Sequence, residues 1–168
     1  MIHQEHHMNK PIGRRAVVGG ALASGTLALA SAIPATAATG YSPKHIVKAF
    51  YESYHLRDLQ TSWNRYIHAD AVMHVPGFDR QSWLEMDSKI VAAFDDLAIT
   101  VLDQLTEGDK VATRWVLGGH HTAHFLDIPP SGRYASFTAT TVDRVKDHRI
   151  IDHWSDADFT AFLQQLAA

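Results

Sequence analysis

Apolar residues recur at steps of three and four positions in separate segments after residue 41, a spacing typical of amphipathic helices. The first segment begins at Ser42-Pro43, where a hydroxyl side chain can cap a helix and proline suits its first position. Its apolar stripe comprises Ile46, Val47, Phe50, Tyr51 and Tyr54. The pattern predicts a helix that begins at Pro43 and packs this stripe against a core.

Two more helices are predicted before residue 95. One covers residues 59–66 behind the cap Asp58, and the other follows Asp79 and ends near Phe94. The buried face of the second is predicted to comprise Trp83, Leu84, Ile90 and Val91. Between the two helices, residues 71–75 predict a short strand that ends at a Pro-Gly pair.

From residue 97 the apolar period changes to two, which is typical of strands. Over residues 97–106 this alternation predicts one face with Ile99, Val101 and Leu105 and an opposite face with Thr100 and Gln104. Turn residues then predict three more strands: one that begins near Arg114 and runs into a proline-containing loop, one that begins at Tyr134, and one over residues 150–156. A last helix would begin at Asp156 or Asp158 and bury Phe159, Phe162, Leu163 and Leu166.

Helices at the front, strands joined by short turns and one closing helix predict an α+β fold. Because short turns connect neighbouring strands, we expect the sheet to be antiparallel.

The stretch before and after the predicted strand from Tyr134 carries a more specific pattern. Residues 119–133 read Gly-His-His-Thr-Ala-His-Phe-Leu-Asp-Ile-Pro-Pro-Ser-Gly-Arg, and His153-Trp154 follows an Asp-His-Arg-Ile turn. This order resembles the SnoaL-like polyketide cyclases, or ester cyclases, of the nuclear transport factor 2-like fold. In that family a Gly-x-His-x-Gly-x-Phe strand precedes an Ile-Pro-Pro-Thr-Gly-Arg loop, so Ala123 and Ser131 are departures. The resemblance covers roughly Ser42 to Leu166.

The resemblance implies a cone-shaped roll, in which N-terminal helices pack on a strongly curved antiparallel sheet and a C-terminal helix closes the fold. It also implies a conical pocket between helices and sheet. Family members are often dimeric through the outer face of the sheet, so we expect a homodimer as one assembly of this chain.

The family's pocket residues map onto this chain only in part. The family's pocket His matches His153, but its acid/base Asp two residues later is Ser155, whose hydroxyl cannot exchange protons near neutral pH as a carboxylate can. The second catalytic His falls at Thr141, and the pocket Asn falls at Met73, with His74 beside it. The family's known aldol mechanism therefore does not transfer directly.

Strand alternation suggests a replacement, because side chains two apart share a face. We take His153, His121 and Asp143 as candidate catalytic residues, in which an Asp–His pair forms an oriented base. The candidate substrate-binding residues are His74, Trp115, Thr141, Ser155 and Met73, of which Ser155 or Thr141 would bind an oxyanion. The alternative is structural: His153 would bond a core carbonyl, and Asp143 would pair with Arg144 or Arg114.

Other patterns in the sequence also bear on possible chemistry. Trp115, Trp83, Phe137 and Tyr54 suit either a pocket lining or plain core. His120, His121, His124 and Asp127 lie close in sequence, but neighbouring strand residues point apart, so we expect no metal site and no cofactor. The chain has no cysteine, which excludes thiol chemistry, and no Gly-x-Ser-x-Gly motif for a serine nucleophile.

The first 37 residues differ from the rest. Lys10 and the Arg14-Arg15 pair precede an uncharged Ala-, Val-, Leu- and Gly-rich run, and Ala35-Thr36-Ala37 gives a small-x-small cleavage site. We predict a signal peptide over residues 1–37, of twin-arginine type, and one α+β domain over residues 38–168. Export by the Sec route, an uncleaved membrane anchor and a start at Met8 remain open alternatives.

The net charge of the chain after residue 37 limits the classes of binding partner that we expect. Residues 1–37 hold three of the 15 basic and one of the 18 acidic residues, so 12 basic and 17 acidic residues remain, a net charge of −5. Nucleic acid and, after cleavage, membrane are therefore not expected as partners. A small hydrophobic molecule is the expected partner. Two functions stay open: a cofactor-free isomerase, cyclase or hydrolase that uses proton transfer, and a secreted protein that only binds such a molecule.

Overall fold

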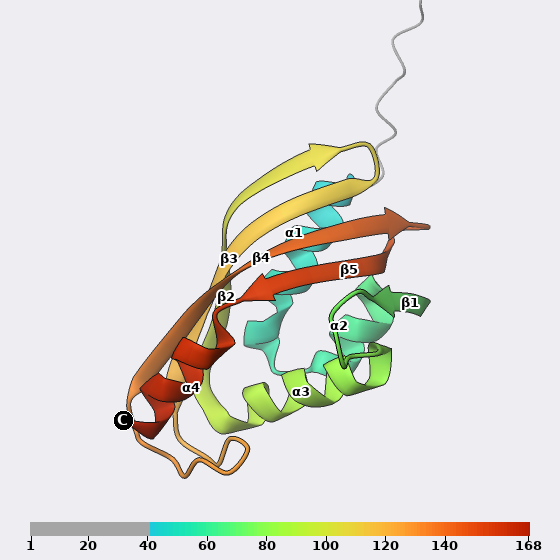
Figure 1. Cartoon of the computed structure of the whole chain (residues 1–168). Coiled ribbons are helices and arrows are strands. Elements are labelled where there is room, and N and C mark those ends of the chain that lie inside the picture. The colour runs from blue at the N-terminus through green and yellow to red at the C-terminus, as the bar shows by residue number, and fades with distance from the viewer. Residues whose placement is uncertain (1–40) are drawn as a thin grey trace, which may run out of the picture. The chain divides into compact units, whose positions relative to one another are not determined.

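The structure, a computed structural model, describes residues 41–168 (Figure 1). The predicted signal peptide lies outside these residues. The helices are α1 (Pro43–Glu52), a 3-10 turn η1 (Ser53–Leu56), α2 (Leu59–Tyr66), α3 (Arg80–Ala93) and α4 (Phe159–Ala167). None of the helices within residues 41–168 has the length and apolar character that crossing a membrane requires.

Each α-helix begins where a side chain caps it. The Ser42 side chain accepts a hydrogen bond from the backbone N–H of His45, and Asp58 and Asp79 accept in the same way at α2 and α3. At α4 the cap is Asp158, the second of the two predicted candidates. These caps satisfy backbone donors that the first turn leaves free, so the predicted helix starts are confirmed.

Five strands form one curved sheet: β1 (Ile67–Met73), β2 (Phe94–Glu107), β3 (Lys110–His121), β4 (Tyr134–Lys146) and β5 (Arg149–Ala157). Their order is β1-β5-β4-β3-β2. All neighbouring pairs are antiparallel except β1 and β5, which run parallel. The predicted α+β class and mainly antiparallel sheet are confirmed, although β1 begins earlier than expected.

The predicted alternation along β2 is wrong beyond Val101. The pairing of β2 with β3 shifts between Val101 and Asp103, so Leu102 is an extra residue in the ladder. Because a bulge of one residue reverses which face each later side chain takes, Gln104 is buried and Leu105 is 77% exposed.

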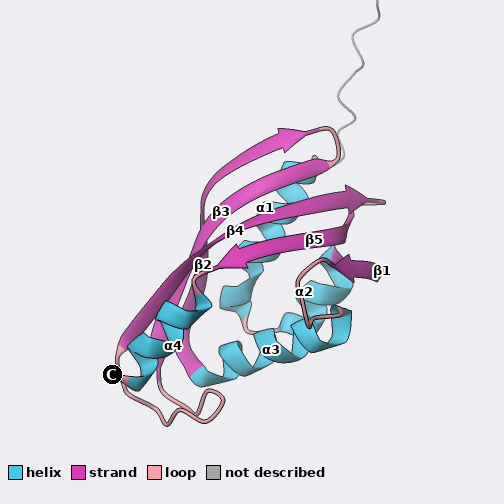
Figure 2. Cartoon of the chain, viewed as in Figure 1, coloured by secondary structure: helices cyan, strands magenta, loops and turns pink. Residues whose placement is uncertain are grey.

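Helices α1, α2 and α3 lie along one face of the sheet, and α4 packs against β4 (Figure 2). Phe50 is the centre of an aromatic core between the helices and makes ring contacts with Tyr54, Trp63 and Trp83. A second cluster, in which Phe162 contacts Phe94, closes the other end of the sheet. The inner face of the sheet also carries buried polar side chains.

Candidate functional site

A cavity of about 330 Å³ lies between the inner face of the sheet and the helices. Most of its wall is apolar, with side chains from α3 opposite side chains from β2, β3, β4 and β5. The apolar lining residues include Met73, Phe78, Trp83, Met86, Ile90, Ile99, Trp115, Leu117, Phe137 and Phe159. The polar lining residues are Tyr51, Tyr54, Asp87, His153, Ser155 and Asp156. A few polar groups in an apolar concave wall are typical of a small-molecule site.

The β4–β5 hairpin brings Asp143 and His153 together. Its two turn residues, Asp147 and His148, both take positive φ, as a type I′ hairpin turn requires. The resulting register, which includes one bulge, sets Asp143 directly opposite His153 on the inner face. Their side chains meet with Nδ1 of His153 2.8 Å from Oδ1 of Asp143. Only 4% of His153 and none of Asp143 is exposed.

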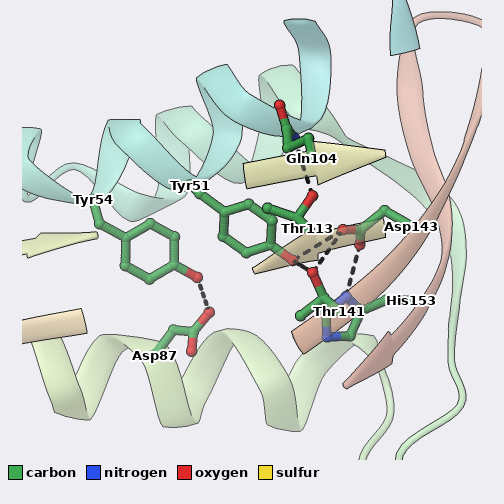
Figure 3. A network of polar contacts seen from close by, with 8 residues as sticks. All are labelled: Tyr51, Tyr54, Asp87, Gln104, Thr113, Thr141, Asp143 and His153. Atoms are coloured by element: carbon green, nitrogen blue, oxygen red, sulfur yellow. Dashed lines mark hydrogen bonds and ion pairs between the residues drawn. The ribbon is translucent and has the colours of Figure 1, made fainter. Parts of the chain in front are cut away.

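The other oxygen of Asp143 is also engaged (Figure 3). The Tyr51 hydroxyl lies 3.0 Å from Oδ2 of Asp143 and 2.9 Å from Oγ1 of Thr141, and Oγ1 of Thr141 lies 3.3 Å from the same Oδ2. Burial, followed by the charge of Asp143, raises the pKa of Tyr51 well above its ordinary value, so Tyr51 stays a neutral hydroxyl. With the ring proton on Nδ1, His153 donates to Oδ1 of Asp143, and Nε2 is left as the nitrogen for a ligand.

A separate polar contact on the same face joins β3 to β2. Thr113 lies opposite Thr141 in the β3–β4 ladder, and Nε2 of Gln104 donates to Oγ1 of Thr113 at 3.0 Å. The bulge in β2 is what turns Gln104 inward to make this bond.

Trp83 covers the imidazole from the helix side. The rings of Trp83 and His153 are stacked, with centroids 4.1 Å apart and planes 15° from parallel. Together, the Asp143 hydrogen bond and this stacking fix both the rotation and the plane of the ring.

A second buried carboxyl group, which the sequence pattern did not single out, reaches the cavity from α3. Asp87 is 8% exposed and lines the cavity, and the Tyr54 hydroxyl donates a hydrogen bond to its Oδ2. Burial raises the pKa of Asp87 from its ordinary 3.8 to about 7, against smaller lowering effects of Tyr54 and His153. The available signal was its spacing, because Asp87 falls on the apolar face set by Trp83 and Leu84.

The predicted binding residues divide into two groups. Met73, Trp115 and Ser155 line the cavity, as do Trp83, Phe137 and Tyr54. Thr141 does not line the cavity. It is buried behind the cavity wall and hydrogen-bonded to Tyr51, so it supports Asp143 and does not contact a ligand.

His121 lies away from the cavity, so the geometry does not support the predicted catalytic role. Its side chain is buried at the far end of β3, against Phe94. Nδ1 of His121 accepts from the backbone N–H of Ser131 at 3.3 Å, and backbone bonds join His121 to Gly132 and Arg133. Burial lowers the pKa of His121, which favours the neutral ring. These hydrogen bonds attach His121 to the proline-containing loop that precedes β4.

His74 also lies outside the cavity lining. Its Nε2 is 2.8 Å from Oδ1 of Asp152, and its ring stacks on Trp154 with centroids 4.2 Å apart. Asp152 and Trp154 alternate with His153 along β5, so this cluster occupies the outer face of the sheet.

The partners named in the structural alternative differ from those that the structure shows. Asp143 pairs with His153, whereas Arg144 pairs with Asp152, and Arg114 pairs with Asp103. Within residues 41–168, no group of three or more His, Asp or Glu side chains is placed to hold a metal ion.

Comparison with known proteins agrees with the fold. Wild-type IdmH from Streptomyces antibioticus, a candidate polyketide cyclase, is 35% identical with a TM-score of 0.65, and the match covers 75% of this chain and 99% of IdmH. AclR from Streptomyces galilaeus, a candidate hydroxylase, is 21% identical with a TM-score of 0.68, and the match covers 74% of this chain and 94% of AclR. A candidate polyketide cyclase from Acidithiobacillus ferrooxidans is 24% identical with a TM-score of 0.64, over 75% of this chain and 96% of that one.

Among curated protein sequences, none matches the chain. The sequence model of the SnoaL-like polyketide cyclases, however, matches residues 44–166. This match takes in every helix and strand from the first turn of α1 to the end of α4. With the helices packed on a curved five-stranded sheet, the chain therefore belongs to the SnoaL-like polyketide cyclase family, with its nuclear transport factor 2-like fold.

Proposed function

We propose that this protein is an exported, cofactor-free catalyst that moves protons on small, hydrophobic carbonyl compounds. Its family indicates a cyclase- or isomerase-type function. The observation that carries the finer proposal is the buried 2.8 Å contact between Nδ1 of His153 and Oδ1 of Asp143 on a cavity wall. An imidazole held in this way is an oriented general base.

The proposed step is enolisation. Nε2 of His153 takes a proton from the carbon next to a carbonyl group, and the C–H electron pair becomes the C=C bond of an enol or enolate. Asp143 stabilises the imidazolium that forms, because its carboxylate is desolvated and bonded to Nδ1–H. Return of the proton to another carbon gives isomerisation. In cyclisation the nucleophilic carbon instead attacks a second carbonyl group of the same molecule, and the alkoxide that forms takes the proton held by His153.

The cavity favours an uncharged substrate. Its lining contains no lysine or arginine, and all lining residues belong to the described part of the chain. A carboxylate-bearing compound would enter an apolar space without a cation to pair it, which is unfavourable. A volume of 330 Å³ equals that of about eleven liquid water molecules, so a compound of a few fused rings would fill it.

Deuterium exchange tests this function without knowledge of the natural substrate. One- to three-ring ketones and 1,3-diketones would be incubated in D₂O with the protein, and deuterium next to the carbonyl group would be measured by mass spectrometry. In His153→Gln, exchange should fall about 10²–10⁴-fold while ligand affinity stays within a few-fold. The matched control is His148→Gln in the exposed β4–β5 turn, which should exchange like the wild type.

A binding protein without turnover is the second candidate, favoured by one observation. Ser155 lines the cavity where the family resemblance places an acid/base Asp. If a compound that co-purifies with the protein stays unchanged on incubation, and no panel ketone exchanges faster with the wild type than with His153→Gln, the catalytic proposal fails and sequestration is the function.

Export is part of the proposal, supported by the basic start, the uncharged run and the Ala-Thr-Ala site of residues 1–37. Mass spectrometry of secreted or periplasmic protein should give an N-terminus within one or two residues of Ala38. Full-length protein in the membrane fraction would contradict it.

A further inference from the structure

Asp87 is a buried carboxyl group that the proposed role of His153 does not use. It lies on α3 one helical turn after Trp83, the residue stacked on His153, so the two positions are about 6 Å apart along the helix axis. Both Asp87 and His153 line the same cavity, one from the helix layer and one from the sheet. A small ligand in the cavity can therefore meet both groups at once.

The surroundings of Asp87 favour its neutral form. Within residues 41–168, it makes no ion pair with a lysine or arginine, and its hydrogen-bond partner is the Tyr54 hydroxyl (Figure 3). A buried carboxylate without a cation is unfavourable, whereas a carboxylic acid in the same place is not. The raised pKa of Asp87, about 7, agrees with this reasoning.

The contact with Tyr54 also orients the acid. The Tyr54 hydroxyl donates to Oδ2, and burial keeps it protonated because the pKa of Tyr54 is raised well above its ordinary value. With Oδ2 acting as an acceptor, the proton of the neutral acid belongs on Oδ1, the oxygen left for a ligand.

We propose that Asp87, as a neutral carboxylic acid, is a second catalytic residue that donates the proton of Oδ1 to the carbonyl oxygen of the substrate while Nε2 of His153 removes the adjacent carbon-bound proton. Tyr54 is its positioning residue. The proposal rests on the proposed function and adds the acid partner of the same reaction.

The step balances without an outside reagent. The carbon-bound proton goes to His153, the C–H pair forms the C=C bond, and the carbonyl π pair takes the Asp87 proton to give a neutral enol. On reversal, His153 returns a proton to carbon and the enol O–H returns its proton to Asp87. The substrate is neither oxidised nor reduced.

This arrangement predicts a particular pH profile. The titratable groups that act on Asp87 are Tyr54 from η1 and His153 from β5, and Tyr51 and Asp143 act on Tyr54 in turn. Because the acid form is required, deuterium exchange should decline as the pH rises through about 7, the pKa of Asp87.

Two variants test the assignment in the exchange assay. In Asp87→Asn the amide keeps the size and can still donate a hydrogen bond, but it cannot transfer a proton or ionise. The rate should therefore fall at least tenfold, towards the roughly 10²–10⁴-fold effect of losing general acid–base catalysis, and the decline near pH 7 should disappear. In Tyr54→Phe the hydrogen bond that lowers the Asp87 pKa is lost, so the decline should move to higher pH. Glu85→Gln, on the exposed side of α3, is the matched control and should keep the wild-type profile.

A binding-independent measurement completes the test. In protein with ¹³C-labelled aspartate carboxyl groups, one resonance should titrate near pH 7 and be missing in Asp87→Asn. The assignment is overturned if Asp87→Asn keeps both the rate and the decline while His153→Gln abolishes exchange, or if every aspartate titrates below pH 5. Failure of the proposed function looks different, because His153→Gln would then exchange like the wild type.

Discussion

The indole of Trp83 and the imidazole of His153 form a stacked pair across two layers of the fold, since Trp83 lies on α3 and His153 on β5. The same imidazole is bonded edge-on to Asp143 from the neighbouring strand. The ring is thus fixed by two contacts at right angles to each other, one through its face and one through its edge. Rotation of the ring about either contact would break the other, so the structure holds Nε2 in one direction.

Removing the stacking should slow proton transfer more than it weakens binding. In Trp83→Leu, His153 loses a contact of about 0.5–1.5 kcal/mol, so turnover should drop roughly two- to tenfold. Trp83→Phe keeps an aromatic face and should recover most of this loss. Deuterium-exchange kinetics and calorimetric ligand binding of both variants would separate slower proton transfer from weaker binding, and denaturant unfolding would show that the variants are folded. A Trp83→Leu protein that is folded and fully active would contradict the orienting role.

We expect Asp143 to contribute to turnover only by holding His153 as the base, and not by a separate role. In Asp143→Asn, the side-chain amide can donate to Nδ1, which places the ring proton on Nε2 and removes the base. Turnover should fall about 10²–10⁴-fold, as in His153→Gln. Because the two residues act as a unit, the double variant should be no slower than either single one. Additive losses in the exchange assay would show that Asp143 has a separate task.

The local features of the fold could be predicted from the sequence because they depend on neighbouring residues. The caps Ser42, Asp58 and Asp79 sit directly before apolar periods, and the Asp147-His148 turn lies between two alternating segments. Features that depend on pairing could not be predicted. Leu102 is an extra residue only with respect to the pairing of β2 with β3. The sequence pattern alone therefore predicted the wrong face for Leu105.

The candidate site was predictable to a similar extent. Alternation placed His153 and Asp143 on one face, and the structure shows them in contact. Alternation does not show where along a strand the cavity ends. His121 therefore points inward on β3, as predicted, but lies beyond the end of the cavity. Asp87 was the hardest site residue to predict from the sequence, because its partner Tyr54 is 33 residues away and only the fold brings the two together.

Blocking the cavity should remove ligand binding without disturbing the polar groups. Met86 lines the cavity from α3 and is partly exposed, so a larger side chain there need not be packed wholly inside the core. Met86→Trp should weaken binding of a panel ketone at least tenfold, as followed by calorimetry, with a small change in Tm. Glu85→Trp adds the same ring to the exposed side of α3 and should bind like the wild type. Equal affinities in the two variants would place the ligand elsewhere.

Titration of Asp87 should make the free energy of unfolding depend on pH. Its pKa is about 7 in the folded protein and near the ordinary 3.8 when the chain is unfolded. Between these values the folded state binds more protons, so the contribution of Asp87 to stability is complete below about pH 4 and declines as the pH rises towards 7. The decline amounts to about 1.4 kcal/mol per pH unit, or about 4 kcal/mol in all.

Asp87→Asn should lack this decline, since an amide does not titrate. Urea unfolding of the wild type and the variant at pH 5 and pH 8 would measure it: the difference in unfolding free energy should shift by about 3 kcal/mol in favour of the variant at the higher pH. Glu85→Gln on the exposed side of the same helix should follow the wild type at both values. If the wild type and Asp87→Asn instead change in parallel, Asp87 is ionised in the folded protein near pH 5, and a neutral acid at this position would have to be abandoned.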